Sequence, residues 1–226
     1  MKAEYQSTAV IIPALNAEVT LPPLLQALRQ FFAAEQIIVV NDGSSDETAG
    51  VANAAHAIVI QHRLNQGKGA ALESGFRFVR RQPQFRFALT MDADLQHLPS
   101  DVPNLFEEQR TSKAAIVVGA RRRFAVGMPL ARILSNTITS SLVSIRTGIS
   151  IPDSQCGFRL IRRDVIENIF LQSSGYEAET EFLIKAAKRS YPISSAPIQT
   201  VYGSERSYMT HATTTGKFLK TLSRKY

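Results

Sequence analysis

The sequence predicts an α/β fold in which a mainly parallel sheet is covered by helices on both faces. Across residues 1–120, short apolar runs typical of buried strands alternate with segments of helical periodicity. Polar loops follow four of these runs directly. With 226 residues the chain is long enough for one domain with a sizeable core and short for two, so a single domain over 1–226 is expected.

The expected elements of the first half follow this alternation in order. Apolar runs predict strands at 10–12, 37–40, 58–60, 88–91 and 115–118. Helical spacing and helix-start signals predict helices over 21–32, from 45 or 46 onward, over 69–80 and over 100–110. Pro22 and Pro23 are compatible with the first helix because they lie near its start.

The second half, 121–226, departs from the alternation. A long helix of mixed polarity is expected over 128–145 and a short strand over 157–161. Helices near 164–170 and 177–189 would rebuild a covering layer, whereas the tail 203–226 is polar, basic and rich in Thr. No linker separates the halves, which supports one domain.

Composition narrows the cellular setting and the kind of partner. An excess of 26 Lys and Arg over 19 Asp and Glu gives a net charge of +7, which favours a lipid surface, a nucleotide phosphate or a nucleic acid. Cys156 is the single cysteine and no apolar signal-peptide core is present, so a cytoplasmic location is expected. No apolar stretch approaches the ~20 residues of a membrane-spanning helix.

Four loops are candidates for one functional site. Ligands of open α/β sheets bind beyond the carboxyl ends of the strands. The loops 14–18, 41–46, 65–68 and 92–97 each follow an expected strand. We therefore expect all four to converge at one edge of the sheet.

The fourth of these loops carries the strongest metal signal. Asp92, Asp94 and Gln96 alternate directly after an apolar strand, and their oxygens suit Mg²⁺ or Mn²⁺ bridging the diphosphate of a nucleotide. An isolated Asp-x-Asp is more often a solvated turn or a helix cap. Its position after a fourth buried strand favours the metal site.

Asp42 and Lys68 are weaker candidates in the second and third loops. Asp42 lies at a strand tip, where its carboxylate would recognise a nucleobase or ribose. Lys68 is flanked by glycines ahead of a helix, and either helps to hold phosphate or belongs to a simple turn. The glycine spacing of a P-loop is absent here.

Five segments, at 12–16, 39–44, 65–69, 91–97 and 156–160, stand in the order typical of family 2 of the glycosyltransferases. Through them nearly the whole chain resembles this family, and most of all its polyprenyl- or dolichyl-phosphate mannose synthases and their glucosyl relatives. The resemblance implies a GT-A fold, a UDP- or GDP-sugar donor and bound Mg²⁺ or Mn²⁺. The half 1–120 would then bind the nucleotide sugar and the half 121–226 the acceptor.

The resemblance also implies roles for individual residues. Pro13, Leu15, Val40 and Asp42 would border the nucleotide, Asp92, Ala93 and Asp94 would meet the ribose and diphosphate, and Asp94 with Gln96 would hold the metal. Arg121 matches an arginine that contacts phosphate, and Arg206 matches a basic residue on a loop over the donor. Ala17, Asn41 and Thr200 depart from the family pattern and leave the donor sugar and base open.

The expected reaction is inverting, metal-dependent transfer of a hexose to a polyprenyl phosphate. A phosphate acceptor is already ionised near neutral pH and needs no general base, so Arg121 and Arg132 would only orient it. The alternative is a family 2 enzyme acting on a sugar hydroxyl, for which Asp153 would be the base rather than a turn cap. Glu179 and Glu181, on an expected helix, are interpreted as functional or merely solvent-facing.

Peripheral membrane contact is expected through 128–145 and the basic segment Lys217 to Lys220 with Arg224 and Lys225. In the alternative interpretation, the apolar residues of 128–145 face the core and the basic tail is only solvated. A membrane-protein partner is a further way to supply an anchor. A nucleotidyltransferase would need a glycine-rich loop that 13–18 does not supply. A nucleic-acid-binding protein is the remote alternative, disfavoured because the basic residues are scattered and the acidic loops would repel a polyanion.

Overall fold

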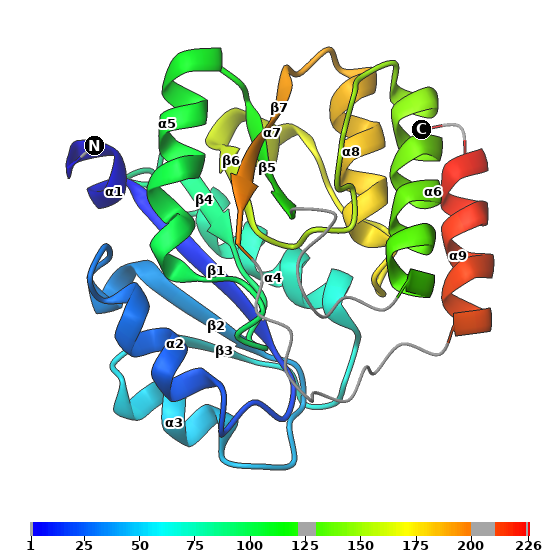
Figure 1. The fold of residues 1–226 in the computed structure, drawn as a ribbon. Helices are drawn as coiled ribbons and strands as arrows, with labels where there is room; N and C mark the ends of the chain where they lie inside the picture. Colours follow the sequence, from blue (N-terminus) through cyan, green and yellow to red (C-terminus); the bar gives the residue numbers. More distant parts are fainter. Residues whose placement is uncertain (1, 122–129, 200–210, 225) are drawn as a thin grey trace.

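A computed structural model of the chain describes residues 2–121, 130–199, 211–224 and 226, and of 130–134 and 211–215 only the backbone. Within this part a seven-stranded sheet forms the centre of the molecule, in the order β3-β2-β1-β4-β6-β5-β7 (Figure 1). The strands are β1 (Thr8–Ala14), β2 (Ile37–Asn41), β3 (Ile58–Gln61), β4 (Phe87–Thr90), β5 (Ile116–Arg121), β6 (Arg159–Arg162) and β7 (Ile193–Ile198).

The sheet is mainly parallel, as predicted. β1 pairs in parallel with β2 and β4, β2 with β3, and β5 with β7. β6 alone among these strands is antiparallel, and it lies between β4 and β5. Because β6 runs in the opposite direction, it begins at the edge where its neighbours end, with Arg159 opposite both Thr90 and Val118. The segment that precedes β6 is thereby delivered to the carboxyl edge of the parallel strands.

Helices cover both faces of the sheet. In Figure 1, α2, α3 and α5 lie on one face and α4 and α8 on the other. The change of face follows from right-handed crossovers, because the chain moves from β1 outward to β3 and then returns past β1 to β4. The helices are α1 (Lys2–Gln6), α2 (Leu21–Leu28), α3 (Thr48–Ala54), α4 (Lys68–Arg80), α5 (Val102–Ser112), α6 (Leu130–Thr147), α7 (Arg163–Asn168), α8 (Ala178–Lys188) and α9 (His211–Ser223).

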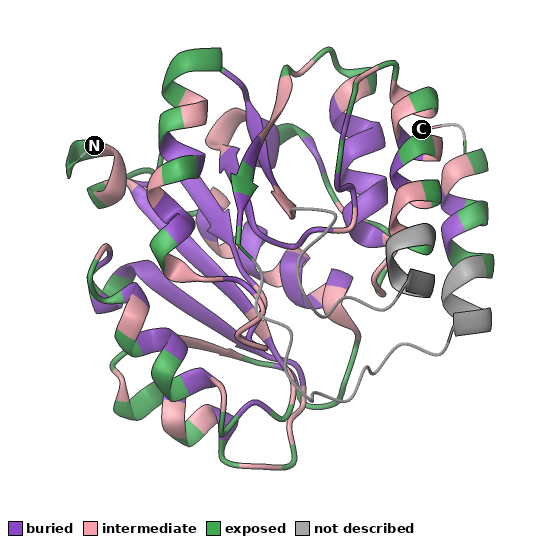
Figure 2. Cartoon of the chain, in the orientation of Figure 1, coloured by how far each residue is buried: buried purple, intermediate pink, exposed green. Residues whose placement is uncertain are grey.

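The core lies between the central strands and the two helical layers. β2 and β4 are buried along their whole length and β1 at all but one position, as the purple strands of Figure 2 show. Continuous apolar strands of this kind are typical of a parallel sheet covered on both faces. On one face, Gly75 of α4 lies so close to Ile11 of β1 that an added Cβ would meet Ile11 Cγ2 at 2.4 Å.

Several details differ from the sequence predictions, and neither α1 nor β7 was predicted. The first predicted helix, 21–32, ends at Leu28, because the chain turns and both Phe31 and Phe32 donate their N–H to the Leu28 carbonyl. The strand predicted over 115–118 continues to Arg121. The tail, for which only a polar, basic and Thr-rich character was predicted, contains α9, which packs on α8 and α6 and in which Phe218 and Thr221 are buried.

Among the described helices, none is both long enough and apolar enough to cross a membrane.

Replacing Gly75 with Ala should destabilise the fold by about 1–3 kcal/mol, because its methyl group has no room beside the stiff, fully buried side chain of Ile11. Urea unfolding followed by circular dichroism measures the change. Gly216→Ala in α9 is the matched control, since nothing lies within 4 Å of its added Cβ, and helix propensity should make it neutral or stabilising by up to about 1 kcal/mol. Equal losses in both variants would contradict this account of the helix–sheet contact.

Candidate functional site

The four polar loops meet at the carboxyl edge of the sheet, as predicted. The backbone N–H of Asn16 donates to Ser44 Oγ over 2.9 Å, and the Ser45 N–H donates to Asn16 Oδ1 over 2.9 Å, so the loops after β1 and β2 are joined. The loop before α4 is joined to β2 through Asp42 and to the loop after β4 through Lys68. The prediction that these loops converge is therefore confirmed.

Pro13, Leu15 and Val40 form the floor of this region. Pro13 lies opposite Val40 in the register of β1 and β2. Pro13 and Leu15 are half-buried, whereas Val40 has 0% of its surface exposed. Val40 therefore supports the site from beneath, and Pro13 and Leu15 are the accessible members of the three.

The Asp42 carboxylate is buried and holds the loop before α4. Its Oδ1 accepts the Gln66 N–H over 2.9 Å and its Oδ2 accepts the Gly67 N–H over 2.8 Å. Oδ1 also lies 2.6 Å from His62 Nδ1. Most of the hydrogen-bonding capacity of Asp42 is thus used within the protein.

Four backbone N–H groups around the start of α4 are already bonded within the protein. Asp42 takes those of Gln66 and Gly67, and the Ser174 carbonyl accepts those of Gly69, at 2.7 Å, and Ala70, at 3.3 Å. Phosphate binding through the backbone of a helix start needs such groups to be free. The side chain of Lys68 is therefore the group at this helix start that is best suited to reach a phosphate.

Lys68 lies between two carboxylates from different parts of the chain. Its Nζ is 2.6 Å from Asp92 Oδ1, after β4, and 2.7 Å from Glu179 Oε1, in the first turn of α8. Burial lowers the pKa of Lys68, but the two carboxylates outweigh burial and raise this pKa above its ordinary value. Burial raises the pKa of Asp92, and Lys68 reverses the effect and holds that pKa below its usual range. Lys68 and Asp92 are therefore both charged at neutral pH.

Asp94 and Gln96 share a tight turn next to Asp92. The Gln96 N–H donates to Asp94 Oδ1 over 3.0 Å. Leu95 between them has a φ of 60°, a left-handed conformation that costs a residue with a side chain about 1–2 kcal/mol. The Leu95 side chain packs against the core, and this contact holds the turn in place.

This turn fits a divalent cation of the Mg²⁺ or Mn²⁺ type by its donor atoms. In the part of the chain that the structure describes, no group of three or more His, Cys, Asp and Glu side chains forms a complete metal cage. Mg²⁺ sites commonly use one or two carboxylates and complete their shell with substrate phosphates and water. The carboxylates of Asp92 and Asp94 and the amide oxygen of Gln96 match that incomplete protein shell, with Ala93 as the small residue between the two carboxylates.

His97 and Cys156 lie beside this turn but carry no reactive charge. His97 Nε2 is 3.9 Å from Asp92 Oδ2, and its ring stacks on Phe158. Burial lowers the pKa of His97 to about 4, and burial together with Asp153 raises the pKa of Cys156 to about 12. At neutral pH the imidazole is uncharged and the thiol is protonated, which removes Cys156 as a nucleophile.

Arg121 and Asp153 form a two-point ion pair at the end of β5. Arg121 Nε donates to Asp153 Oδ2 over 2.5 Å, and Nη2 donates to Oδ1 over 2.8 Å. The side chains are 9% and 8% exposed, so water competes little with the contact. Asp153 was a candidate base or turn cap, and in this structure both of its oxygens hold the Arg121 guanidinium.

Glu179 and Glu181 do not face solvent, so that interpretation is wrong. Their exposed fractions are 4% and 0%. Glu181 accepts the N–H groups of Gln172 and Ser173 and pairs with Lys185, which gives it a structural role. Charged residues at the start of an amphipathic helix normally face water. Here Glu179 is buried against Lys68 at the start of α4, and Glu181 is buried against the segment before α8. Arg206, Thr200 and the side chain of Arg132 lie outside the described residues.

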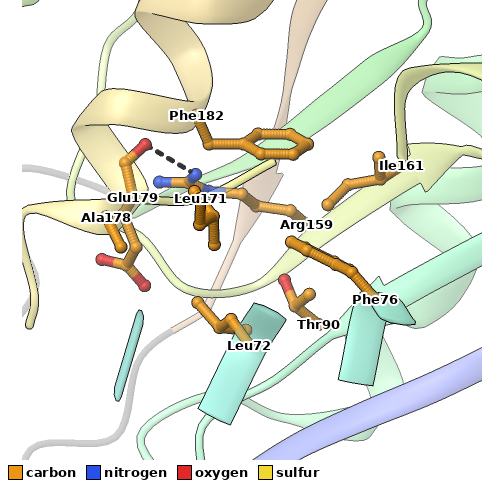
Figure 3. A pocket seen from close by; sticks show the side chains of 9 residues that line it. All are labelled: Leu72, Phe76, Thr90, Arg159, Ile161, Leu171, Ala178, Glu179 and Phe182. Carbon is orange, nitrogen blue, oxygen red and sulfur yellow. Dashed lines mark hydrogen bonds between the residues drawn. The ribbon is translucent and has the colours of Figure 1, made fainter. Parts of the chain in front are cut away.

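Arg159 organises the region behind Glu179. Its side chain, 3% exposed, donates to the carbonyls of Ser154, Cys156 and Glu179, and thereby ties the segment before β6 to the first turn of α8. Figure 3 shows this guanidinium at a small, mostly apolar pocket. The pocket is lined by Leu72, Phe76, Thr90, Arg159, Ile161, Leu171, Ala178, Glu179 and Phe182. Arg159 thus acts as a structural support for Glu179.

The family model described as "Glycosyl transferase family 2" matches residues 9–170 of the chain. An uncharacterised protein of Methanocaldococcus jannaschii is 31% identical over 85% of this chain and 81% of its own length. An undecaprenyl-phosphate mannosyltransferase of Micrococcus luteus is 31% identical over 83% of this chain and 81% of its own. A UDP-N-acetylglucosamine–dolichyl-phosphate N-acetylglucosaminyltransferase of Methanococcus voltae is 29% identical over 85% of both chains.

Among solved structures, glucosyl-3-phosphoglycerate synthase of Mycobacterium tuberculosis superimposes with a TM-score of 0.79. It is 20% identical, and the match covers 98% of this chain and 82% of that one. That enzyme was crystallised with Mn²⁺, UDP and its product, and in another crystal with Mg²⁺ and UDP. This likeness confirms the predicted GT-A fold.

Breaking the Arg121–Asp153 pair should destabilise the protein strongly. Asp153→Ala leaves the Arg121 guanidinium buried without its partner, which should cost about 3–5 kcal/mol in urea unfolding. The double variant Arg121→Met, Asp153→Ala should lose clearly less than the sum of the two single variants, because neither charge then remains unpaired.

The Arg162–Asp164 pair is the matched control, because it has the same chemistry but side chains 38% and 42% exposed. Asp164→Ala should cost less than about 1 kcal/mol. Additive losses at Arg121 and Asp153, or losses no larger than at the exposed pair, would rule out a strong coupling between the two buried groups.

Proposed function

The chain belongs to glycosyl transferase family 2 and is a glycosyltransferase, and on that premise we propose that it transfers a hexose, with inversion, from a UDP- or GDP-sugar to a polyprenyl phosphate. The relatives from Micrococcus luteus and Methanococcus voltae carry names that state transfer to undecaprenyl phosphate and to dolichyl phosphate. These names support a lipid phosphate as acceptor. They differ in the sugar, so the donor is left to experiment.

The Arg121–Asp153 pair is the observation that favours a phosphate acceptor over a sugar hydroxyl. Transfer to a sugar hydroxyl needs a carboxylate that is free to take the proton. Both oxygens of Asp153 hold Arg121, and Glu179, the other buried carboxylate nearby, is paired with Lys68. A phosphate monoester, with a second pKa of about 6, is already ionised at neutral pH and needs no base. A guanidinium held in place suits the binding of such an acceptor.

The donor would lie across the carboxyl edge of β1, β2 and β4. Pro13 and Leu15 would border the nucleotide, and the buried Val40 and Asp42 would support them from within the protein. Asp92, Ala93 and Asp94 would meet the ribose and diphosphate, and Asp94 with Gln96 would hold Mg²⁺ or Mn²⁺. The bound cation would supply Lewis acidity toward the departing diphosphate. Arg206 is assigned to the same leaving group by the family resemblance alone.

The contribution of this chain's own residues is electrostatic. As the bond from the anomeric carbon to the diphosphate breaks, negative charge grows on the leaving group while the acceptor attacks from the opposite face. Lys68 and Arg121 are cations already held by Asp92, Glu179 and Asp153. Groups fixed before the reaction need no reorganisation when the charge develops, which is the main source of electrostatic catalysis.

The surface that would meet a lipid membrane is formed by α6 and α9. The two helices lie side by side (Figure 1), and Arg146 of α6 donates to the carbonyls of Leu222 and Arg224 at the end of α9. Exposed apolar side chains on this surface are Ile138 and Ile145 of α6 and Leu219 of α9, with the exposed basic residues Lys217, Lys220 and Arg224. Mixed apolar and basic residues suit an anionic lipid interface. The proposal places the chain at the cytoplasmic face of that membrane.

The first test is nucleoside diphosphate release from UDP-glucose, UDP-galactose, UDP-N-acetylglucosamine and GDP-mannose, with and without a short polyprenyl phosphate. One donor should be turned over, the lipid phosphate should stimulate release, EDTA should stop it, and added Mn²⁺ or Mg²⁺ should restore it. Turnover that ignores the lipid phosphate but responds to a sugar alcohol would favour a hydroxyl acceptor instead.

In the same assay Asp94→Asn should lower kcat by on the order of 100-fold, as expected when charge stabilisation of a leaving group is lost. Asp164→Asn makes the same chemical change at an exposed ion pair on α7 and should keep full activity. Equal activity of the two variants would remove Asp94 from the site.

Membrane contact is tested by sedimentation with liposomes that contain anionic phospholipid. At low salt the protein should sediment, and Lys217→Glu with Lys220→Glu should abolish sedimentation while the unfolding midpoint is retained. Arg81→Glu with Lys113→Glu makes the same change of net charge at exposed positions directly after α4 and α5 and should leave binding in place. If both double variants lose binding equally, net charge rather than the α6–α9 surface is responsible.

A further inference from the structure

His62 links two strands and a helix beneath the loop that carries Lys68. It directly follows β3, its N–H donates to the Asn41 carbonyl over 2.9 Å, and only 7% of its surface is exposed. Ring atom Nδ1 lies 2.6 Å from Asp42 Oδ1, and Nε2 lies 2.9 Å from Ser74 Oγ on α4. The imidazole is therefore held at both nitrogens.

The partners determine where the ring proton lies. An ionised carboxylate only accepts hydrogen bonds, so His62 Nδ1 carries the proton that it donates to Asp42, and in the neutral ring Nε2 accepts the Ser74 hydroxyl. Ser, His and Asp in this order resemble a hydrolytic triad. Ser74, however, lies in the middle of α4, where the backbone N–H groups are used by the helix and none is left to stabilise an oxyanion. The chain of contacts ends at a structural hydroxyl.

At its other end the chain of contacts reaches the backbone before α4. Asp42 accepts the N–H groups of Gln66 and Gly67. On the opposite side the loop presses against Ser174, since a Cβ added to Gly67 would meet the Ser174 carbonyl oxygen at 2.4 Å. Gly67 also has a φ of 96°, which other residues rarely adopt. The loop is thus clamped between Asp42 and the segment before α8.

Lys68 is the next residue, and its Nζ lies between Asp92 and Glu179. The backbone N–H groups of Gln66, Gly67, Gly69 and Ala70 are taken by Asp42 and Ser174, so the ammonium group is the main contact that this loop offers to a donor. The direction of that ammonium group depends on where Asp42 holds the loop.

We propose that His62 is a positioning residue, which fixes the Asp42 carboxylate so that Asp42 anchors the loop and aims Lys68 at the diphosphate of the donor. The inference rests on the proposed function, because it requires a nucleoside diphosphate at this edge of the sheet. It gives Asp42 an indirect role: the carboxylate acts on the diphosphate through the loop. If Asp42 instead contacted the nucleobase directly, loss of the His62 contact should weaken the binding of nucleosides, which lack phosphate, as much as that of nucleotides.

Two substitutions of His62 separate the roles of its nitrogens. The amide nitrogen of Asn occupies nearly the place of Nδ1, whereas that of Gln occupies nearly the place of Nε2. His62→Gln therefore loses the contact with Asp42, and His62→Asn keeps it. The matched control is His56→Gln, at a histidine that is exposed.

Dissociation constants for UDP, GDP, uridine and guanosine are measured by titration calorimetry and ligand-observed NMR in the presence of Mn²⁺. For the nucleotide that the unaltered chain binds, His62→Gln should weaken affinity about tenfold, the scale of one charge-assisted hydrogen bond, while the matching nucleoside changes less than about twofold. His62→Asn should recover most of the loss. In turnover, the donor KM should rise more than kcat falls.

Gly67→Ala gives a second route should His62→Gln fold poorly. It displaces the same loop from the Ser174 side, so it should reproduce the selective loss of diphosphate affinity. Equal losses for nucleotide and nucleoside would mean that Asp42 reads the base directly and would overturn the inference, as would unchanged affinity in both variants. If the unaltered chain binds neither UDP nor GDP, the proposed function itself is rejected. The inference then fails with it, because it requires a nucleoside diphosphate at this edge of the sheet.

Discussion

The arrangement of the site depends on the need to keep a buried Lys68 charged and paired. Its ammonium group lies between Asp92 and Glu179, which come from the end of β4 and from the first turn of α8. A buried ion without partners is strongly destabilising, so the three segments that carry these groups must stay together. One lysine therefore joins the first half of the chain, through Asp92, to the second half, through Glu179.

The reversed strand β6 makes the second part of the site possible. Because β6 is antiparallel to β4 and β5, the segment before it arrives at the edge where the parallel strands end. That segment contains Asp153, and β5 ends in Arg121, so the two meet as a buried pair. Arg159, the first residue of β6, ties the same segment to Glu179. One partner of each cation, Asp153 for Arg121 and Glu179 for Lys68, is thus positioned by β6 or by the segment before it.

The acidic residues around the site hold different partners. Asp42 holds a loop, Asp153 holds Arg121, and Glu179 shares Lys68 with Asp92. Asp94 accepts the Gln96 N–H in a turn maintained by the packing of Leu95, and like Asp92 it is half-buried. The oxygen atoms of Asp92, Asp94 and Gln96 in this partly exposed turn suit a metal and its phosphate ligands.

The sequence by itself determined the α/β class, the succession of the first five strands along the chain, the convergence of four loops and the Asp92–Asp94 turn. These features depend on local periodicity and on the rule that loops follow the carboxyl ends of parallel strands, both of which are readable along the chain. Only the tertiary structure decided that Glu179 is buried against Lys68, that Asp153 holds Arg121, and that His62 supports Asp42. Each of these pairs joins residues at least 20 positions apart, and no local pattern specifies which distant partner a buried charge will find.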